Sequence, residues 1–240
     1  LGTSVSYLAE GEERFNLDEV RASLEVGSWE VSDDLVPNFG FSAPPHWFHI
    51  SLQNVESVPV ERILEIGYSM LDHLEVYIVD ARGEVTSYRG GDRQLFSERL
   101  IEHRNFLYPL EFEPGQEINV FVRVETTSSL QLPIKLWDRE AFYGQEQSNL
   151  LLQGLYFGLM LLMILYNLFI YFSVRERVYL IYVCYISFLV LALGAMHGFG
   201  FQFLWPESLW WQEKCSIVAC GFSLCFMTWF ANEFLNLRSA

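Results

Sequence analysis

An uncharged run at residues 150–172 is the feature that most constrains the fold of this chain. A helix needs about 20 apolar residues to cross a bilayer core of roughly 30 Å, so the run is long enough to span a membrane. A helix on the surface of a soluble protein keeps a polar face, but Gln153 and Asn167 are the only strongly polar side chains here. The run therefore predicts a soluble part before it and a membrane part after it.

Charge divides the chain at the same place. Residues 1–149 hold 11 of the 15 Lys and Arg residues and 26 of the 30 Asp and Glu residues, so the whole net charge of −15 lies there. About 150 residues suffice for one domain with its own core, and the remaining part has room for roughly three spans. The bilayer is thus an expected partner. Nucleic acid is not, because an acidic domain repels phosphate backbones.

Short runs of alternating apolar and polar residues fill residues 24–148, and turn residues bound each run. The runs lie at 47–52, 63–66, 74–79, 85–88, 106–110, 118–124 and 132–136. Gly83 and Gly115 supply the conformational freedom that turns at 80–84 and 113–116 need. This spacing predicts an antiparallel β-sandwich of jelly-roll type. Residues 1–23 are more polar, and they predict a solvated segment with one short helical turn near Asn16.

The membrane part divides into three predicted spans, at 149–173, 178–196 and 213–233. Arg175 and Arg177 lie in the short loop between the first two spans, and such residues mark the cytoplasmic side. The β domain is then extracytoplasmic, and residues 234–240 end in the cytoplasm. If the source is a Gram-negative cell, the membrane is the inner membrane and the β domain lies in the periplasm. An aromatic loop at 197–212 lies on the outer side.

Four residues of the membrane part are candidates for packing or signal relay. Gly154 and Gly158 form a GxxxG pattern, which serves either a homodimer or contacts within one bundle. Asn167 is a polar group inside the first span, and Trp205 lies in the aromatic loop. That loop is either an interfacial anchor or an element that carries the state of the β domain into the bundle.

Catalytic and metal-binding motifs are absent from the sequence. It contains no HExxH, GxSxG, P-loop or paired Cys/His spacing, so we expect no enzymatic activity, no cofactor and no metal site in this chain. His46 and His49 are three apart, which places them on opposite faces of a strand. The Gly90-Gly91-Asp92 triplet looks like part of a diguanylate cyclase motif but lies between predicted strands, so we interpret it as a turn.

One cluster of polar residues is the first candidate for a ligand site in the β domain. Its members are Asp92, Ser97, Arg99, His103 and Arg104. Two arginines in an acidic domain can hold a carboxylate or sugar hydroxyls through several fixed donors. The alternative is that Arg99 and Arg104 neutralise neighbouring carboxylates and pin the loop to the sandwich. Those carboxylates belong to Glu98, Glu102 and Glu111.

Aromatic side chains provide a second kind of sugar contact, because their faces stack on the apolar faces of sugars. Trp29 and Tyr88 lie nearer to loops and are the candidates for such a role. Trp47 and Tyr77 lie inside strand runs, where core packing is the better interpretation.

The sequence also resembles a known family of receptors. The segments PHWFHISLQN at 45–54, LDHLEVY at 71–77 and SSLQLP at 128–133 resemble the type 2 extracellular domain of bacterial seven-transmembrane receptors with diverse intracellular signalling modules. The segments at 91–104 and 136–137 also resemble this domain, and all the matching segments occur in the same order as in the family. Residues 154–171 and the Arg175–Arg177 loop look like the start of that family's membrane bundle.

This resemblance implies a sensor: a jelly-roll domain similar to carbohydrate-binding modules, a seven-helix bundle, and a cytoplasmic output such as a diguanylate cyclase or histidine kinase. Only three spans lie within these residues, so we assign no output activity to them. We expect the sandwich to bind a small carbohydrate or carboxylate. The alternatives are a module that binds a periplasmic protein, and, less favoured, a membrane-anchored enzyme acting on glycans, which would need two carboxylates across a cleft.

Overall fold

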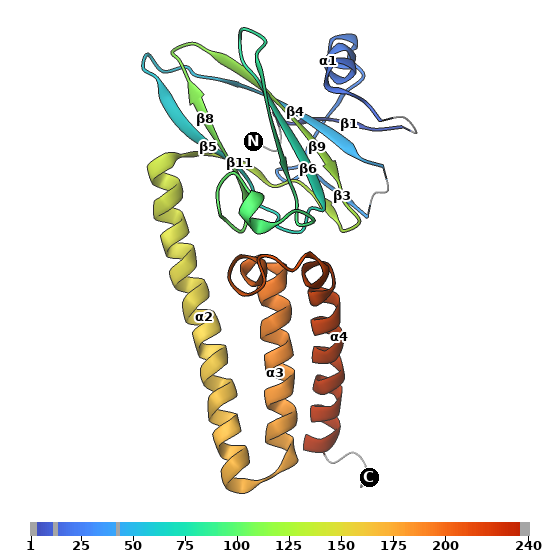
Figure 1. Ribbon diagram of the computed structural model, residues 1–240, viewed down its shortest axis with the longest axis vertical. Helices are drawn as coiled ribbons and strands as arrows, with labels where there is room; N and C mark the ends of the chain where they lie inside the picture. Colours follow the sequence, from blue (N-terminus) through green and yellow to red (C-terminus); the bar gives the residue numbers. More distant parts are fainter. Residues whose placement is uncertain (1–3, 12–13, 42–43, 236–240) are drawn as a thin grey trace. The chain divides into compact units, whose positions relative to one another are not determined.

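The chain folds into a β-sandwich unit, Leu1–Phe142, and a helical unit, Tyr143–Ala240 (Figure 1). The computed structural model describes residues 4–11, 14–41 and 44–235.

Two antiparallel sheets form the sandwich. The larger sheet has the strand order β2 (Glu30–Val31), β1 (Ser6–Ala9), β4 (His46–Gln53), β9 (Glu117–Glu125), β6 (His73–Val79) and β7 (Val85–Gly90). The smaller sheet has the order β11 (Ile134–Asp138), β5 (Val60–Ile66) and β8 (Phe106–Phe112). A short pair, β10 (Leu130–Gln131) and β3 (Asn38–Gly40), adds to these. Six of the seven predicted runs fall on strands, and the seventh, at 132–136, begins two residues before β11. The predicted antiparallel β-sandwich followed by membrane-spanning helices is confirmed.

The main core lies between the two sheets. Phe48 and Val76 come from the larger sheet and Leu64 and Phe112 from the smaller one, and all four are buried in one cluster. Within each strand, every second residue points into this core, so the core forms from one buried face of each sheet.

A second cluster covers part of the other face of the larger sheet. Helix α1 (Leu17–Val26) packs there, and Val20 is fully buried with Trp47 and Phe121. Asn16 caps this helix, since its side chain accepts from the Glu19 N–H and the Glu19 carboxylate accepts from the Asn16 N–H.

The prediction for residues 1–23 is partly wrong in the part that the structure describes. The helical turn near Asn16 is present as the start of α1, but the segment is not simply solvated. Strand β1 lies between β2 and β4 in the sheet, and Val5 is fully buried. The prediction failed because the polar residues mask an apolar stripe. Leu17, Val20 and Leu24 recur at helical spacing, and all three pack in the second cluster.

The helical unit contains three helices that are long and apolar enough to cross a membrane. They are α2 (Arg139–Val174), α3 (Arg177–Met196) and α4 (Leu209–Phe234), and a short π-helical turn, η3 (Gly200–Leu204), lies between α3 and α4. Helices α3 and α4 lie side by side (Figure 1). Between them, Phe188 stacks on Phe222 and Phe226.

Two helix boundaries differ from the expected spans. Helix α2 begins at Arg139, well before residue 149, because Asp138 accepts the backbone N–H groups of Glu140 and Ala141 and so starts the helix early. Helix α4 begins at Leu209, inside the expected aromatic loop. Of the cytoplasmic end expected at 234–240, residues 236–240 lie outside the described part.

The turn after β7 depends on glycine. Gly91 has φ 133°, and a Cβ there would overlap the backbone oxygen of Asp72. The next residue, Asp92, donates its N–H to Leu71 O at 2.7 Å. The Gly90-Gly91-Asp92 triplet is therefore a turn between β-sheet elements, as predicted, and it fixes the end of β7 against the start of β6.

Replacing Gly91 with alanine should lower the free energy of unfolding by more than the equivalent change at Gly83. Both glycines have positive φ, but a Cβ at Gly83 meets no atom within 4 Å. We expect Gly83→Ala to cost about 1 kcal/mol for its backbone conformation, and Gly91→Ala to cost about 3 kcal/mol because backbone atoms must also shift. Denaturation followed by tryptophan fluorescence measures both, and equal losses would contradict this account.

Candidate ligand-binding site

A polar pocket of about 320 Å³ lies on the outer face of the larger sheet, across β9, β6 and β7. Its lining comprises Arg14, His73, Leu74, Glu75, Arg89, Gly90, Gln94, Arg123 and Glu125. Charged and amide side chains dominate this lining. The pocket is therefore suited to a small polar ligand and not to an apolar one.

Strand register builds the floor of the pocket. Trp47 on β4 is opposite Arg123 on β9, Arg123 is opposite Glu75 on β6, and Glu75 is opposite Arg89 on β7. Directly opposed residues point to the same face of a sheet, so these four side chains form one row across four strands. The tryptophan end of the row lies under α1, and the arginine end is open.

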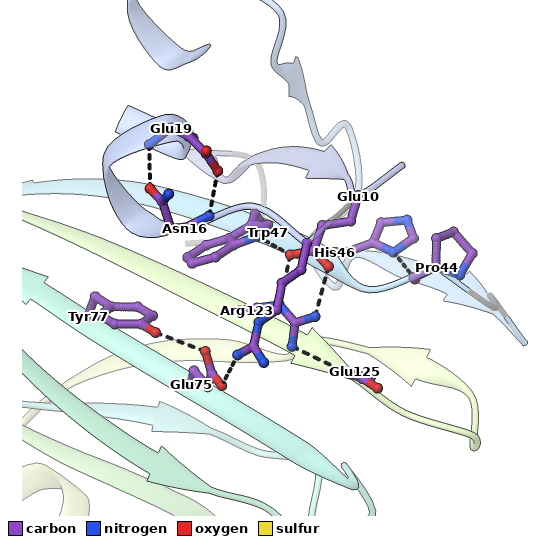
Figure 2. A network of polar contacts seen from close by, with 11 residues as sticks. Glu10, Asn16, Glu19, Pro44, His46, Trp47, Glu75, Tyr77, Arg123 and Glu125 are labelled. Carbon is purple, nitrogen blue, oxygen red and sulfur yellow. Dashed lines mark hydrogen bonds and ion pairs between the residues drawn. The ribbon is translucent and has the colours of Figure 1, made fainter. Parts of the chain in front are cut away.

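A buried ion pair anchors this row (Figure 2). The Nε and Nη2 atoms of Arg123 donate to the two carboxylate oxygens of Glu10, each at 2.8 Å, and the indole Nε1 of Trp47 donates to Glu10 at 2.7 Å. The Glu10 and Arg123 side chains are only 2% and 5% exposed. Arg123 also donates from Nη1 to Glu125 at 3.0 Å, so all three of its nitrogens are used.

These contacts set the ionisation of both partners. Burial alone raises the pKa of Glu10, but the hydrogen bonds from Arg123 and Trp47 outweigh it, and the pKa lies below its ordinary value of 4.5. Burial alone lowers the pKa of Arg123, and its hydrogen bonds to Glu10 and Glu125 reverse that effect. The pair is thus fully charged at neutral pH.

A second ion pair lies beside the first. Arg14 donates from Nη2 to Glu75 at 2.6 Å, and the Tyr77 hydroxyl donates to the other Glu75 oxygen at 2.8 Å. Burial alone raises the pKa of Glu75, but the hydrogen bonds from Tyr77 and Arg14 lower it by a larger amount. The pKa therefore lies below its ordinary value, and the group is ionised at neutral pH. Arg14 lies just before α1, so this contact joins the N-terminal segment to the pocket.

Arg99, from the predicted ligand cluster, pins a loop. Its Nη1 donates to the backbone oxygens of His103 and Arg104 at 2.7 and 2.8 Å, and its guanidinium lies over the rings of Phe96 and Phe106. Burial lowers the pKa of Arg99 to about 10, so it remains charged at neutral pH. These contacts agree with the alternative interpretation, in which Arg99 pins the loop to the sandwich. A ligand-binding role for the cluster stays a prediction.

The other members of that cluster have different environments. Ser97 is exposed on a short 3₁₀ helix, whereas Asp92 and Arg104 are half-buried. His103 is buried, with its ring edge-on to Phe142 at 5.6 Å between centroids.

The two candidate aromatic residues are not brought together with the cluster to form one surface. Trp29 is half-buried beside α1, where it packs on His49 and Phe121 and donates to Ser23 Oγ. Tyr88 packs against the main core, with its ring 5.6 Å from that of Tyr108. Both rings are engaged in packing.

Five charged residues of the pocket escaped the sequence analysis: Arg14, Glu75, Arg89, Arg123 and Glu125. A weak signal existed in the strands, because Glu75 and Arg123 stand at the outward positions of otherwise apolar runs. Charged residues at outward strand positions are common on any sheet, and only the pairing register shows that these meet. Among the described residues, no group of three or more His, Cys, Asp or Glu could hold a metal ion.

The relay candidates lie in the helical unit. A Cβ added at Gly154 or Gly158 would meet no atom within 4 Å in the part of the chain that the structure describes. Asn167 donates to Met163 O within its own helix at 2.9 Å. Trp205 donates to Gln212 Oε1 at 2.9 Å, lies against Gly200, and lines an apolar pocket of about 280 Å³ with residues of α3 and η3.

Comparison with protein families identifies both parts of the chain. The family model for the 7TMR-DISM extracellular 2 domain matches residues 2–138, and the model for the 7TM diverse intracellular signalling domain matches residues 149–240. The chain belongs to the 7TMR-DISM receptor family. It is a membrane receptor chain with an extracellular sensor domain and membrane helices, as the resemblance implied.

Other comparisons add little to the 7TMR-DISM assignment. No curated protein matches the chain. Among solved structures, the enzymatically active domain of tailspike protein 4 from bacteriophage CBA120 aligns with 10% identity and a TM-score of 0.28, over 55% of this chain and 18% of the phage chain. This likeness is too weak to support an argument about fold or function.

Replacing Glu10 with glutamine should lower the free energy of unfolding by about 3 kcal/mol, because Arg123 would keep its buried charge and lose the main partner of that charge. Glu25→Gln is the matched control, since Glu25 is exposed on α1. Chemical denaturation at pH 7 measures both variants. A loss below about 1 kcal/mol for Glu10→Gln would show that the pair contributes no more than a surface pair.

Stability should fall in acid, and Glu10→Gln should reduce that fall. The pKa of Glu10 and of Glu75 is lowered in the folded state. Their contribution is therefore complete above the ordinary pKa of 4.5 and is lost as the pH falls through the lower folded values. Melting temperatures measured from pH 7 to pH 3 test this. Parallel curves for wild type and Glu10→Gln would contradict it.

Replacing Gly200 with alanine should displace Trp205, because the added Cβ would overlap the indole ring. We expect a loss of about 1 to 3 kcal/mol, together with a changed tryptophan near-UV circular dichroism signal as the Gln212 hydrogen bond breaks. Gly194→Ala is the control. Gly194 lines the same apolar pocket, and its Cβ would meet no atom within 4 Å.

Proposed function

We propose that residues 1–148 sense a small polar ligand, and that the receptor transmits ligand occupancy through its membrane helices to a cytoplasmic output domain of the whole protein. The observation that carries this proposal is the polar pocket on β9, β6 and β7, which lies in the domain that the family assigns to sensing. The ligand is a carbohydrate or a carboxylate, because the pocket offers both fixed donors and acceptors.

The proposed location is the bacterial inner membrane, with the β-sandwich in the periplasm. Arg175 and Arg177 flank the short connection between α2 and α3, and paired cations of this kind favour the cytoplasmic side. No catalytic role is proposed for this chain. A catalytic output, as in other receptors of this kind, would belong to a further domain.

Helix α2 is the proposed route for the signal. Phe142 lies in its first turn and is 4% exposed, packed with Ile63 and Leu107 on the outer face of the smaller sheet. The helix continues from there to Val174 without interruption. A ligand that favours one of two packings of the sandwich would thereby bias the position of α2, which is how occupancy shifts a two-state receptor.

A second candidate function is binding of a periplasmic protein. Exposed apolar side chains near β2 and β3 favour it, with Val31 61%, Leu35 77% and Phe41 86% exposed. Scattered exposed apolar residues are normal, but several within one segment are typical of contact surfaces. This function would need no small ligand.

A thermal-shift screen of the full chain in detergent tests the first function. A ligand that binds only the folded state stabilises it by about 2.7 kcal/mol at a hundred times its Kd, so the melting temperature must rise. The panel contains neutral sugars, small carboxylates and nucleotides. No shift across the panel, combined with concentration-dependent association of the chain, would favour the protein-binding function instead.

Two neutral substitutions locate the site once a ligand is found. Gln94→Ala removes an amide that lines the polar pocket, and Ser97→Ala removes a hydroxyl of the cluster predicted from sequence. We expect Gln94→Ala to weaken binding roughly tenfold and Ser97→Ala to leave it unchanged. The opposite result would move the site to the loop that Arg99 pins.

A further inference from the structure

The three arginines of the polar pocket differ in how their donors are used. Arg123 is committed to Glu10 and Glu125, and Arg14 is paired with Glu75. Arg89 is exposed, and its side chain makes no hydrogen bond or ion pair with any residue that the structure describes. Its planar guanidinium is therefore the cation of the pocket that an incoming ligand can engage fully.

The sheet holds Arg89 in a fixed place. Arg89 is opposite Glu75, and the turn that follows it is fixed by Gly91. Neighbouring strands lie about 4.8 Å apart, so Arg89 and Arg123 flank Glu75 with about 10 Å between their backbones. A ligand of a few carbon atoms can reach from Arg89 to the Arg14–Glu75 pair.

The described residues that line the pocket offer a sugar no aromatic platform. His73 provides the only ring among them. Trp47 and Tyr77 lie on the same face of the sheet, but they stack on each other in the cluster beneath α1. Neutral sugars depend on ring faces for much of their binding, whereas carboxylates depend on guanidinium forks, which this pocket supplies.

We propose that the pocket binds a small ligand carrying a carboxylate, that Arg89 holds this carboxylate through its guanidinium, and that Glu75 competes with the ligand for Arg14. The inference rests on the proposed function and narrows its ligand class. The effect of Glu75 on affinity distinguishes the two ligand classes. If the ligand is an anion, the Glu75 carboxylate opposes it, and if the ligand is a neutral sugar, the same carboxylate accepts its hydroxyls.

Isothermal titration calorimetry on the full chain in detergent at pH 7 and low ionic strength tests the proposal. The probes are succinate, L-glutamate and citrate against glucose and maltose. For a carboxylate that binds, Arg89→Gln should raise the Kd roughly tenfold to hundredfold, because a hydrogen-bonded charge partner is lost. Glu75→Gln should lower the Kd, since it removes a repelling charge, frees Arg14 and still accepts from Tyr77.

Arg82→Gln is the matched control. Arg82 is an exposed arginine in the turn at the other end of the β6–β7 hairpin, so the same charge is lost outside the pocket. Its Kd should equal that of the wild type. Added salt should weaken carboxylate binding, because it screens the attraction between the charges.

The outcomes separate this inference from the proposed function. Binding of a sugar that Glu75→Gln weakens would overturn the carboxylate assignment and leave the sensor function standing. If the Arg89→Gln variant binds a carboxylate with the same Kd as the wild type, the proposed role of Arg89 is overturned. No heat from any probe, together with no thermal shift in the wider panel, would overturn the small-ligand function itself.

Discussion

The buried Glu10–Arg123 pair is the interaction on which the sensor domain depends. It joins residues 113 positions apart and closes the end of β1 onto β9. Removing two charges from water is costly, and such a pair is tolerated only where further hydrogen bonds complete it. Trp47 and Glu125 provide those bonds here. Truncating either partner would leave the other charge buried without its main partner.

The same pair fixes the floor of the polar pocket. With Arg123 fixed by Glu10, its row across the sheet has one end in a hydrophobic cluster under α1 and the other in an open polar pocket. The N-terminal segment contributes to both ends, through Val20 in the cluster and Arg14 in the pocket. Arg14 in the pocket is thus connected to the packing of α1 by covalent continuity of the chain.

Sequence reasoning succeeded where the signal is local. Alternating runs predicted the strands, the glycines at 83, 91 and 115 marked their turns, and uncharged length predicted the spans. It failed at the N-terminus, where three apolar residues among many charges were enough to hold a helix on the sheet. The Arg99 cluster stays a predicted ligand site, because composition cannot distinguish a guanidinium that pins a loop from one that faces a ligand.

The sequence by itself determined the division of this chain into an acidic β domain and a membrane part, because hydrophobic length, charge and residue alternation are properties of contiguous residues. Only the tertiary structure decided which charges meet. Arg14, Glu75, Arg89 and Arg123 come from four separate segments, and their proximity follows from strand order and register. A shift of one residue in that register would turn those strand side chains to the opposite face, so no local pattern could have assembled the pocket.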